Sequence, residues 1–272
     1  MHRRSFLGLT SLAAVGASAF PTSLAPAAQG PRWAPDGAGL LGRFGVLTPE
    51  FDPVPESEMS AMAPQGVSIH ASRVRRNLTP AAFAEPPHVD TAAEQLADLA
   101  PNAIVFAYTS SSYVLGVAAD GPIRARLEAR ARGIPVVLTC TAATDAFRAF
   151  GAKRVALIHP PWFSEEVNAK GMDYFRNQGF EVVLAARITP ARSFTEVRPE
   201  EVYEWVRANT PPEAQAVFIG GNGLRAVGAI RALEATLRRP VLTANQVALW
   251  AALRIAKVST NVTDYGRLFR TS

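Results

Sequence analysis

The feature that most constrains the fold is a regular alternation of short apolar segments with amphipathic segments from residue 43 onward. The apolar segments are rich in Val, Ile and Leu, which is typical of strands buried on both faces of a parallel sheet. Strands that alternate with helical segments indicate a parallel sheet with helical crossovers. The predicted strands are residues 43–48, 67–74, 103–107, 134–139, 154–159, 181–186, 216–219 and 240–243.

The segments between these strands carry apolar residues at helical spacing, and several end at a glycine, a common helix stop. Residues 50–64 are polar and rich in proline, so we expect a long loop, or a loop with a short helix, there. The predicted helices are residues 91–99, 123–132, 142–150, 167–178, 199–208, 224–237 and 246–255.

Three sequence landmarks occur twice in the same order. GVLTP, ending at Pro49, resembles ALIHP, ending at Pro160; AIVFAYTSSS resembles AVFIGGNG; and PVVLTCTAATDAFRAFGAK resembles PVLTANQVALWAALRIAK. Any one match is common among apolar strands, whereas three in the same order indicate an internal repeat. We therefore predict an α/β fold of two similar parallel-sheet halves related by pseudo-two-fold symmetry. The first comprises residues 31–150, with the C-terminal segment packing back on it, and the second residues 151–272.

Small polar residues follow the predicted strand 103–107, at Tyr108, Thr109 and three serines. Open parallel sheets bind ligands at the carboxyl ends of their strands, where hydroxyls and backbone N–H groups suit an anion. An ordinary turn rich in Ser and Thr has the same composition. If the halves face each other, their strand ends form one cleft suited to a carboxylate. Its expected lining is Pro49, Asp52, Tyr108, Thr109, Ser110 and Cys140 from the first half, and His159, Gly221, Asn222 and Asn245 from the second.

Charge and residue counts exclude several function classes. The formal net charge is +5, but Lys and Arg are interleaved with Asp and Glu, so nucleic-acid binding is not expected. A single cysteine excludes an intrachain disulfide and metal sites built from several cysteines. The four histidines show no close ligand spacing, so we expect no metal. An oligomer remains open.

Residues 1–30 have the pattern of a targeting segment. Arg3 and Arg4 precede an apolar stretch, residues 6–20, that is short for a bilayer-spanning helix, and small residues near Ala25–Ala28 suit cleavage. The R-R-x-F-L pattern resembles a twin-arginine signal; a chance arginine pair on an ordinary secretory signal is the alternative. Both place the mature chain outside the cytoplasm, periplasmic or secreted, and without stable membrane insertion.

Distinctive stretches cover almost the whole chain after residue 30: GVLTPEFDPVPESE, IHASRVR, YTSSSYVLG, FRAFGAKRVALIHPPWFSEEVN, FIGGNGLRAVGAI, LTANQVALWAALR and the terminal YGRLF. Together they resemble the maleate cis-trans isomerase and arylmalonate decarboxylase branch of the aspartate/glutamate racemase superfamily, with a pattern closer to the maleate isomerases. The resemblance implies two similar α/β halves, an active site between them, and no cofactor.

The same resemblance shows where this chain departs from the family. Two-cysteine members place their cysteines at the positions of Tyr108 and Gly221, and the decarboxylases keep the second. This chain has neither. A thiolate serves the family as nucleophile or proton donor because its pKa can lie near neutrality. Glycine cannot replace it, and an ordinary phenol has too high a pKa to do so.

Other substrate-binding positions of the family are retained. Thr109 and Ser110 match its anion-binding Thr-Ser, and Asn168 matches the asparagine that follows its second-half Pro-aromatic segment. Pro49 matches the proline at the first strand end. Asp52 stands where the family often has Asn, and its carboxylate would repel a dianion such as maleate. Trp162 is matched to the family's usual tyrosine.

Cys140, His159 and Tyr108 are the candidate catalytic residues in place of the cysteine pair. Cys140 is either a relocated thiol or a small buried cysteine. His159 is either a general acid or base or a structural histidine beside two prolines. Tyr108 either donates a hydrogen bond to substrate or fills the vacated space. Glu56 and Glu58 are expected to be solvated rather than a catalytic carboxylate pair.

Two functions remain open on the sequence. The first is an exported, cofactor-independent enzyme that acts on a small carboxylic acid by neither the two-cysteine nor the one-cysteine chemistry. The second is a family member that has lost catalysis and binds a small carboxylate in the same cleft. The third possibility is a structural or inactive protein whose cleft is filled by its own side chains.

Overall fold

The computed structural model describes residues 36–75, 79–190, 196–259 and 262–271. The predicted targeting segment, residues 1–30, lies outside these ranges. Within them, every helix is too short or too polar to traverse a lipid bilayer.

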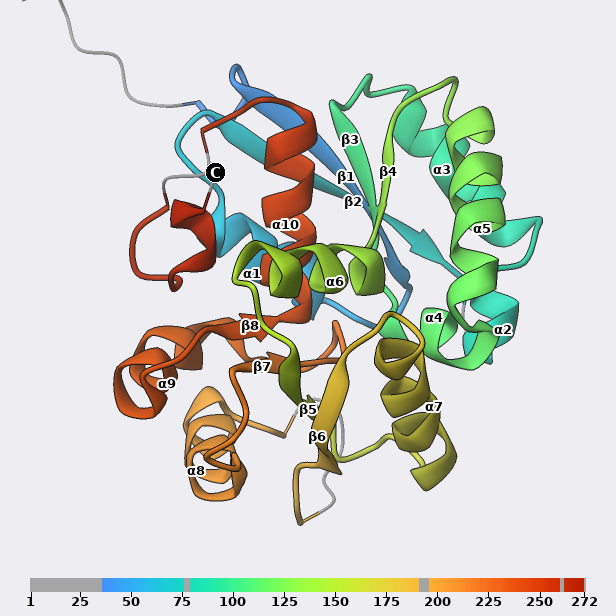
Figure 1. The fold of residues 1–272 in the computed structure, drawn as a ribbon. Coiled ribbons are helices and arrows are strands. Elements are labelled where there is room, and N and C mark those ends of the chain that lie inside the picture. Colours follow the sequence, from blue (N-terminus) through green and yellow to red (C-terminus); the bar gives the residue numbers. More distant parts are fainter. Residues whose placement is uncertain (1–35, 76–78, 191–195, 260–261, 272) are drawn as a thin grey trace, which may run out of the picture. The chain divides into compact units, whose positions relative to one another are not determined.

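Two parallel four-stranded sheets with the same strand order form the framework (Figure 1). The first sheet has the order β2-β1-β3-β4 and the second β6-β5-β7-β8, so in each the first strand of the half lies between its second and third. In the first sheet the strands are β1 (Gly42–Pro49), β2 (Val67–Val74), β3 (Ala103–Phe106) and β4 (Val136–Leu138). In the second they are β5 (Arg154–His159), β6 (Glu181–Arg187), β7 (Ala216–Ile219) and β8 (Val241–Thr243).

The three sequence landmarks fall on equivalent strands of the two sheets. GVLTP and ALIHP lie on β1 and β5, the second pair begins at β3 and β7, and the third contains β4 and β8. The pairing is parallel throughout, with Gly45 beside Ile104 in the first sheet and Leu157 beside Phe218 in the second. The prediction of an α/β fold with two similar halves is confirmed.

Helices cover both faces of each sheet, and their ends follow local sequence. The Ser164 side chain accepts the N–H of Val167 to begin α7, and Thr243 with Gln246 forms a capping box that begins α10. The helices are α1 (Val54–Met62), α2 (Pro80–Phe83), α3 (His88–Ala97), α4 (Thr109–Leu115), α5 (Val117–Arg130), α6 (Thr139–Ala149), α7 (Glu165–Arg176), α8 (Pro199–Asn209), α9 (Ile230–Leu237) and α10 (Ala244–Ile255), with short 3-10 turns η1 (Val227–Ala229) and η2 (Leu268–Arg270).

Several segments differ in detail from the predicted elements, and α2, for example, was not predicted. The Thr-Ser run after β3 is helical as α4 and ends at Gly116, whose φ of +79° suits glycine. Residues 50–64 contain α1, so the alternative of a loop with a short helix is the one observed. The helix expected over residues 224–237 is confined to α9 and follows the turn η1.

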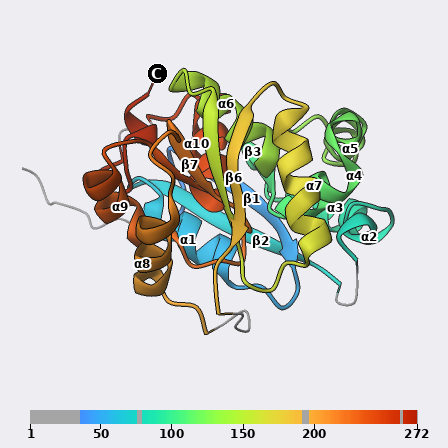
Figure 2. The same ribbon diagram turned by 60° about the horizontal axis from the view of Figure 1, so that its bottom comes forward.

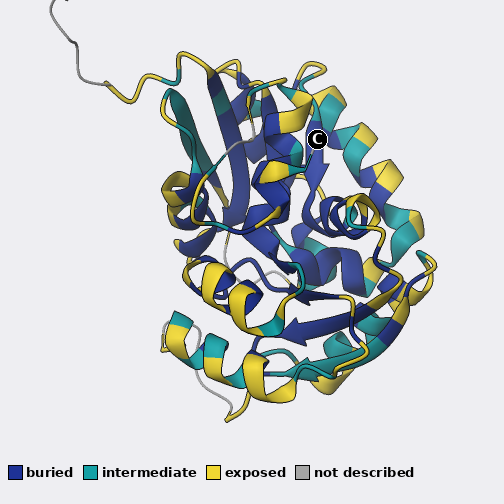
Figure 3. Ribbon diagram, turned by 60° about the vertical axis from the view of Figure 1, so that its left-hand side comes forward, coloured by how far each residue is buried: buried dark blue, intermediate teal, exposed yellow. Residues whose placement is uncertain are grey.

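Six of the eight strands are almost entirely buried, as their apolar composition predicts, whereas β2 and β6 are mostly half-buried (Figure 3). In β5, Val155 and Leu157 face a cluster that contains residues of α6 and α7, whereas Ala156 and Ile158 face a cluster with residues of α8. Figure 2 shows α7 on one side of this sheet, with α8 and α9 on the other. This packing leaves the strand ends and the loops after them to form a site.

Each half contributes a helix to the other half's core. Phe147 of α6 lies 5.7 Å, ring centroid to ring centroid, from Phe175 and 6.3 Å from Phe218, both in the second half. The α10 helix packs against β3 and β4 of the first sheet and against α6 (Figure 1). One hydrophobic cluster therefore joins the two sheets.

We expect Phe147→Ala to lower the free energy of unfolding by about 3–5 kcal/mol, because it removes a fully buried ring from the cluster shared by both halves. Urea denaturation checks this. The matched control is Ile255→Ala at the end of α10, where the side chain is 45% exposed and the change should stay within about 0.5 kcal/mol. Equal losses for the two variants would contradict the shared core.

Candidate functional site

A pocket of about 570 Å³ lies where the carboxyl ends of the two sheets meet. It is reached from four strand ends: Asp52 follows β1, Tyr108 follows β3, Trp162 follows β5 and Gly221 follows β7. Both halves therefore contribute to one pocket. Its lining is Phe51, Asp52, Pro80, Tyr108, Thr109, Ser110, Trp162, Phe163, Ser164, Val167, Gly221, Asn222 and Gly223.

Six of the ten predicted site residues line this pocket: Asp52, Tyr108, Thr109, Ser110, Gly221 and Asn222. Trp162, which was matched to the family's usual tyrosine, also lines the pocket. Four apolar residues that were not predicted from the sequence also line the pocket: Phe51, Pro80, Phe163 and Val167. Three of these lie within a few residues of a named position, so proximity to the strand ends was a usable signal, whereas Pro80 comes from a separate helix.

Thr109 and Asn222 hold the two halves together at the base of the pocket. The Thr109 N–H donates to Asn222 Oδ1 (3.0 Å), and the Gly221 N–H donates to Thr109 Oγ1 (3.1 Å). Both backbone donors are thus satisfied inside the protein. The anion cradle expected here has fewer donors for a ligand than the sequence implies.

Gly221 has a backbone that excludes a side chain. Its φ is +84°, and a Cβ at this position would lie 2.2 Å from Pro160 Cγ. Contacts this short require the proline to move, and a positive φ disfavours any L side chain. The position that carries a cysteine in the family by resemblance therefore has no room for a thiol in this backbone.

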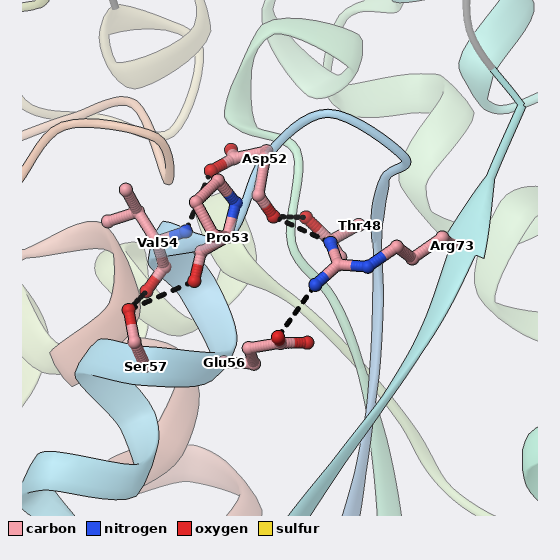
Figure 4. A network of polar contacts seen from close by, with 7 residues as sticks. All are labelled: Thr48, Asp52, Pro53, Val54, Glu56, Ser57 and Arg73. Atoms are coloured by element: carbon pink, nitrogen blue, oxygen red, sulfur yellow. Dashed lines mark hydrogen bonds and ion pairs between the residues drawn. The ribbon is translucent and has the colours of Figure 1, made fainter. Parts of the chain in front are cut away.

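Asp52 is the acidic side chain of the pocket wall. Its polar contacts with Val54, Thr48 and Arg73 are drawn in Figure 4. Its side chain is 3% exposed, and Oδ1 accepts the N–H of Val54 (3.0 Å). Arg73 donates to the Asp52 carbonyl oxygen (2.9 Å) and to Glu56 Oε1 (2.6 Å), so its guanidinium does not pair with the Asp52 carboxyl. Burial raises the pKa of the Asp52 carboxyl to about 7.

Tyr108 is neutral at the pocket. Its ring packs against Phe83, with centroids 4.4 Å apart, and burial raises the pKa of its phenol. A neutral phenol donates or accepts a hydrogen bond but does not supply a phenolate near pH 7.

Cys140 does not line the pocket. It is fully buried in the first turn of α6, where its thiol donates to the Thr109 carbonyl oxygen (3.6 Å). Burial raises the pKa of this thiol well above its ordinary value. Of the two alternatives, a relocated thiol and a small buried cysteine, the structure shows the buried cysteine for Cys140.

His159 is fully buried and pairs with the half-buried Asn168, and both lie outside the pocket lining. His159 Nδ1 lies 2.8 Å from Asn168 Oδ1, and Nε2 lies 3.2 Å from the Tyr113 hydroxyl. Burial lowers the pKa of His159 to about 4, so the ring is neutral near pH 7. Asn168 Nδ2 donates to the Ala185 carbonyl (3.2 Å), which leaves this amide occupied.

The other two residues expected in the cleft, Pro49 and Asn245, are buried and do not line the pocket. Pro49 is buried at the end of β1, and its carbonyl oxygen accepts the Asp52 N–H (3.0 Å), which turns the chain toward the pocket. Asn245 is buried behind Asn222, which donates from Nδ2 to Asn245 Oδ1 (3.0 Å).

Glu58 corrects the expectation of a solvated carboxylate. It lies on α1, not on a loop, and is 9% exposed. Its Oε1 accepts the N–H groups of Ala226 (2.7 Å) and Val227 (3.1 Å). Burial raises the pKa of this carboxyl to about 7. Glu56, by contrast, is part-exposed in its ion pair with Arg73. No spacing rule distinguishes the two from sequence.

No group of three or more His, Cys, Asp or Glu side chains that could hold a metal ion occurs in the described part of the chain. The chemistry available at the pocket is therefore that of one carboxyl group of near-neutral pKa, several hydroxyls and an apolar wall.

Known proteins resemble the chain in both sequence and fold. It is 27% identical over 170 residues to the arylmalonate decarboxylase of Bordetella bronchiseptica, which spans 60% of this chain and 69% of that protein. The maleate isomerase of Pseudomonas putida S16, solved with maleate, superposes with a TM-score of 0.77 at 23% identity over 85% of this chain and 98% of the other.

Two further solved structures share the fold. The maleate cis-trans isomerase of Nocardia farcinica has a TM-score of 0.75 at 22% identity over 84% of this chain and 98% of its own. An arylmalonate decarboxylase structure has a TM-score of 0.68 at 20% identity over 84% and 99%. The family model for arylmalonate decarboxylase matches residues 47–269, which include the end of β1, all the other strands and all of the pocket lining. The chain therefore belongs to the arylmalonate decarboxylase family.

Proposed function

We propose that the protein binds a small carboxylic acid with an apolar substituent and acts on it without a cofactor, with Asp52 as the proton donor and acceptor. The observation that carries this proposal is a carboxyl group with a pKa of about 7 on the wall of the family's inter-half pocket. A group with a pKa near the working pH is the most efficient general acid or base. The residues first considered for catalysis, Cys140 and His159, lie outside the lining.

The composition of the pocket favours an apolar substituent. Aromatic side chains (Phe51, Tyr108, Trp162, Phe163) form much of its wall, together with Pro80 and Val167. Apolar rings contribute affinity by removing ligand surface from water, and a small number of polar groups fix its orientation. Ser110 and Asp52 are the polar side chains that would orient the acid.

Asp52 serves a carboxylate ligand only in its neutral form. Protonated Asp52 donates a hydrogen bond to a carboxylate oxygen, whereas ionised Asp52 repels it. A dianion would need both carboxylates satisfied, and the N–H groups of Thr109 and Gly221 are already occupied. The pocket therefore suits a ligand with one bound carboxylate better than a dianion held at both ends.

Asp52 and the aromatic wall of the pocket would support a decarboxylation in the following steps. The bond between the α carbon and one carboxylate breaks, CO₂ leaves, and the electron pair remains on the α carbon and the retained carboxylate. A carboxylate surrounded by aromatic side chains is poorly solvated, which favours its conversion to neutral CO₂. The Asp52 proton then transfers to the α carbon, and water returns a proton to Asp52.

Binding without turnover is the second candidate. It is favoured by the internal satisfaction of the Thr109 and Gly221 N–H groups, since charge that develops in a transition state needs free donors. Assays of binding and product formation on the same preparation separate the two candidates.

We expect Asp52→Asn to reduce turnover of phenylmalonate by about 10²-fold or more, because the amide cannot transfer a proton. Release of CO₂ and formation of phenylacetate are measured with the wild type and the variant. Asp98→Asn, a surface change that breaks the pair with Arg132, is the matched control and should retain wild-type turnover. Undiminished turnover in Asp52→Asn would remove Asp52 from the mechanism, and binding without any product would favour the second candidate.

The affinity for phenylacetate should fall as pH rises through about 7. Asp52 is neutral below its raised pKa and ionised above it, whereas the probe remains an anion throughout, so affinity should drop by up to about tenfold per pH unit above 7. Calorimetric titrations at intervals of about half a pH unit between roughly pH 5.5 and 8.5 measure how steeply the affinity falls with pH. In Asp52→Asn the slope should flatten. A slope unchanged by this variant would assign the titration to another group.

We also propose that residues 1–30 direct export through a twin-arginine pathway, a proposal supported by sequence alone. Replacing both Arg3 and Arg4 by Lys should leave the unprocessed chain in the cytoplasm of a bacterial host, as judged by cell fractionation and mass. Normal processing of this variant would instead indicate an ordinary secretory signal.

A further inference from the structure

Glu58 is a buried carboxylate that the proposed chemistry does not use. It lines a second pocket of about 440 Å³ together with Ser57 and Arg225, and it is absent from the lining of the acid pocket. Its hydrogen bonds nevertheless lead to the acid pocket. We propose that Glu58 is a positioning residue, which orients Asn222 through Asn245 and thereby fixes the Thr109 end of the acid pocket.

A continuous series of hydrogen bonds joins Glu58 to the Thr109 end of the acid pocket. Thr109 N–H donates to Asn222 Oδ1 (3.0 Å), Asn222 Nδ2 donates to Asn245 Oδ1 (3.0 Å), and Asn245 Nδ2 donates to Glu58 Oε2 (2.8 Å). Each donor points from the acid pocket toward Glu58. Asn222, Asn245 and Glu58 are all buried, which limits the competition of water for these bonds.

The donor-to-acceptor direction of these hydrogen bonds is set at Glu58. Above about pH 7, where Glu58 is ionised, its carboxylate is an acceptor only, whereas each asparagine side chain presents one acceptor and one donor group. Glu58 therefore requires the Nδ2 end of Asn245 to face it. Asn245 must then present Oδ1 to Asn222, and Asn222 in turn presents Oδ1 to Thr109.

Neighbouring acceptors reinforce the same orientation. Asn245 Nδ2 also donates to the Asn222 carbonyl oxygen (2.8 Å), and Asn222 Nδ2 also donates to Thr139 Oγ1 (3.2 Å). A reversed amide would set oxygen against oxygen at these contacts. The contact between the halves at Thr109 thus depends on a carboxylate three hydrogen bonds away, through Asn222 and Asn245.

Glutamine at position 58 cannot satisfy all three donors that converge there. Its single oxygen can accept the N–H groups of Ala226 and Val227, but its NH₂ group then faces Asn245 Nδ2. Two donors in contact without an acceptor are destabilising when buried. Asn245 and then Asn222 lose their fixed orientation.

The first arm of the test needs no ligand. Thr109 is the first residue of α4, so its N–H has no partner within the helix and its exchange with solvent reports the bond to Asn222. In Glu58→Gln this exchange should rise by about tenfold over the wild type. Asn245→Ala should produce a similar rise, which makes the test independent of whether Glu58→Gln folds.

Glu234→Gln is the matched control. Glu234 is also a buried carboxylate, 6% exposed, and it accepts two backbone N–H groups, from Val241 (3.2 Å) and Arg267 (3.0 Å), but it has no bond to the Asn245 chain. Thr109 exchange should be unchanged in this variant. Exchange in Glu58→Gln within about twofold of the wild type, or an equal rise in Glu234→Gln, would overturn the proposal.

A double variant tests whether Glu58 acts through Asn245. In the Asn245→Ala background, Glu58→Gln should add less than about twofold to Thr109 exchange, because the connecting link is already absent. Additive effects would mean that Glu58 stabilises this region generally and would contradict the positioning role.

The second arm rests on the proposed function and measures calorimetric affinity for phenylacetate. It should fall about tenfold in Glu58→Gln and remain unchanged in Glu234→Gln. If the wild type binds no acid, the proposed function fails while the exchange arm still decides the role of Glu58. If the wild type binds and Glu58→Gln binds equally well, Glu58 does not position the acid pocket.

Discussion

The pair of hydrogen bonds between the halves, from Thr109 N–H to Asn222 and from Gly221 N–H to Thr109, is the contact on which the site depends. It joins the loop after β3 to the loop after β7, so the carboxyl ends of two separate parallel sheets form one pocket. The exchanged packing of α6 and α10 supports the same arrangement from the core side. A repeated α/β unit alone would leave each strand end open to solvent.

This seam also limits the chemistry that the pocket can perform. Gly221 approaches Pro160 so closely that no side chain fits, and Tyr108 packs on Phe83 at the other family cysteine position. The Gly221 position cannot hold a reactive thiol without movement of Pro160. The chain belongs to the family, but its function must be argued from the site rather than from the fold.

Burial determines which titratable groups are usable. Cys140 and His159 are buried in the interior, where the cost of removing charge from water keeps the thiol and the imidazole neutral. The same effect acts on Asp52, but this carboxyl borders the pocket, so the neutral and ionised forms are both accessible to a ligand near pH 7. Desolvation at a ligand-accessible position thus gives Asp52 its proposed role.

The sequence by itself determined the alternation of strands and helices, the internal repeat, the family and most of the polar pocket residues, whereas the strand order came from the structure. These depend on local periodicity and on motifs at strand ends, which short-range sequence reports directly. Only the tertiary structure decided that Cys140 and His159 are buried away from the pocket, and that Glu58 is buried while Glu56 is partly exposed. Depth of burial arises from packing between segments more than 100 residues apart, such as Glu58 with Asn245, and no local pattern encodes it.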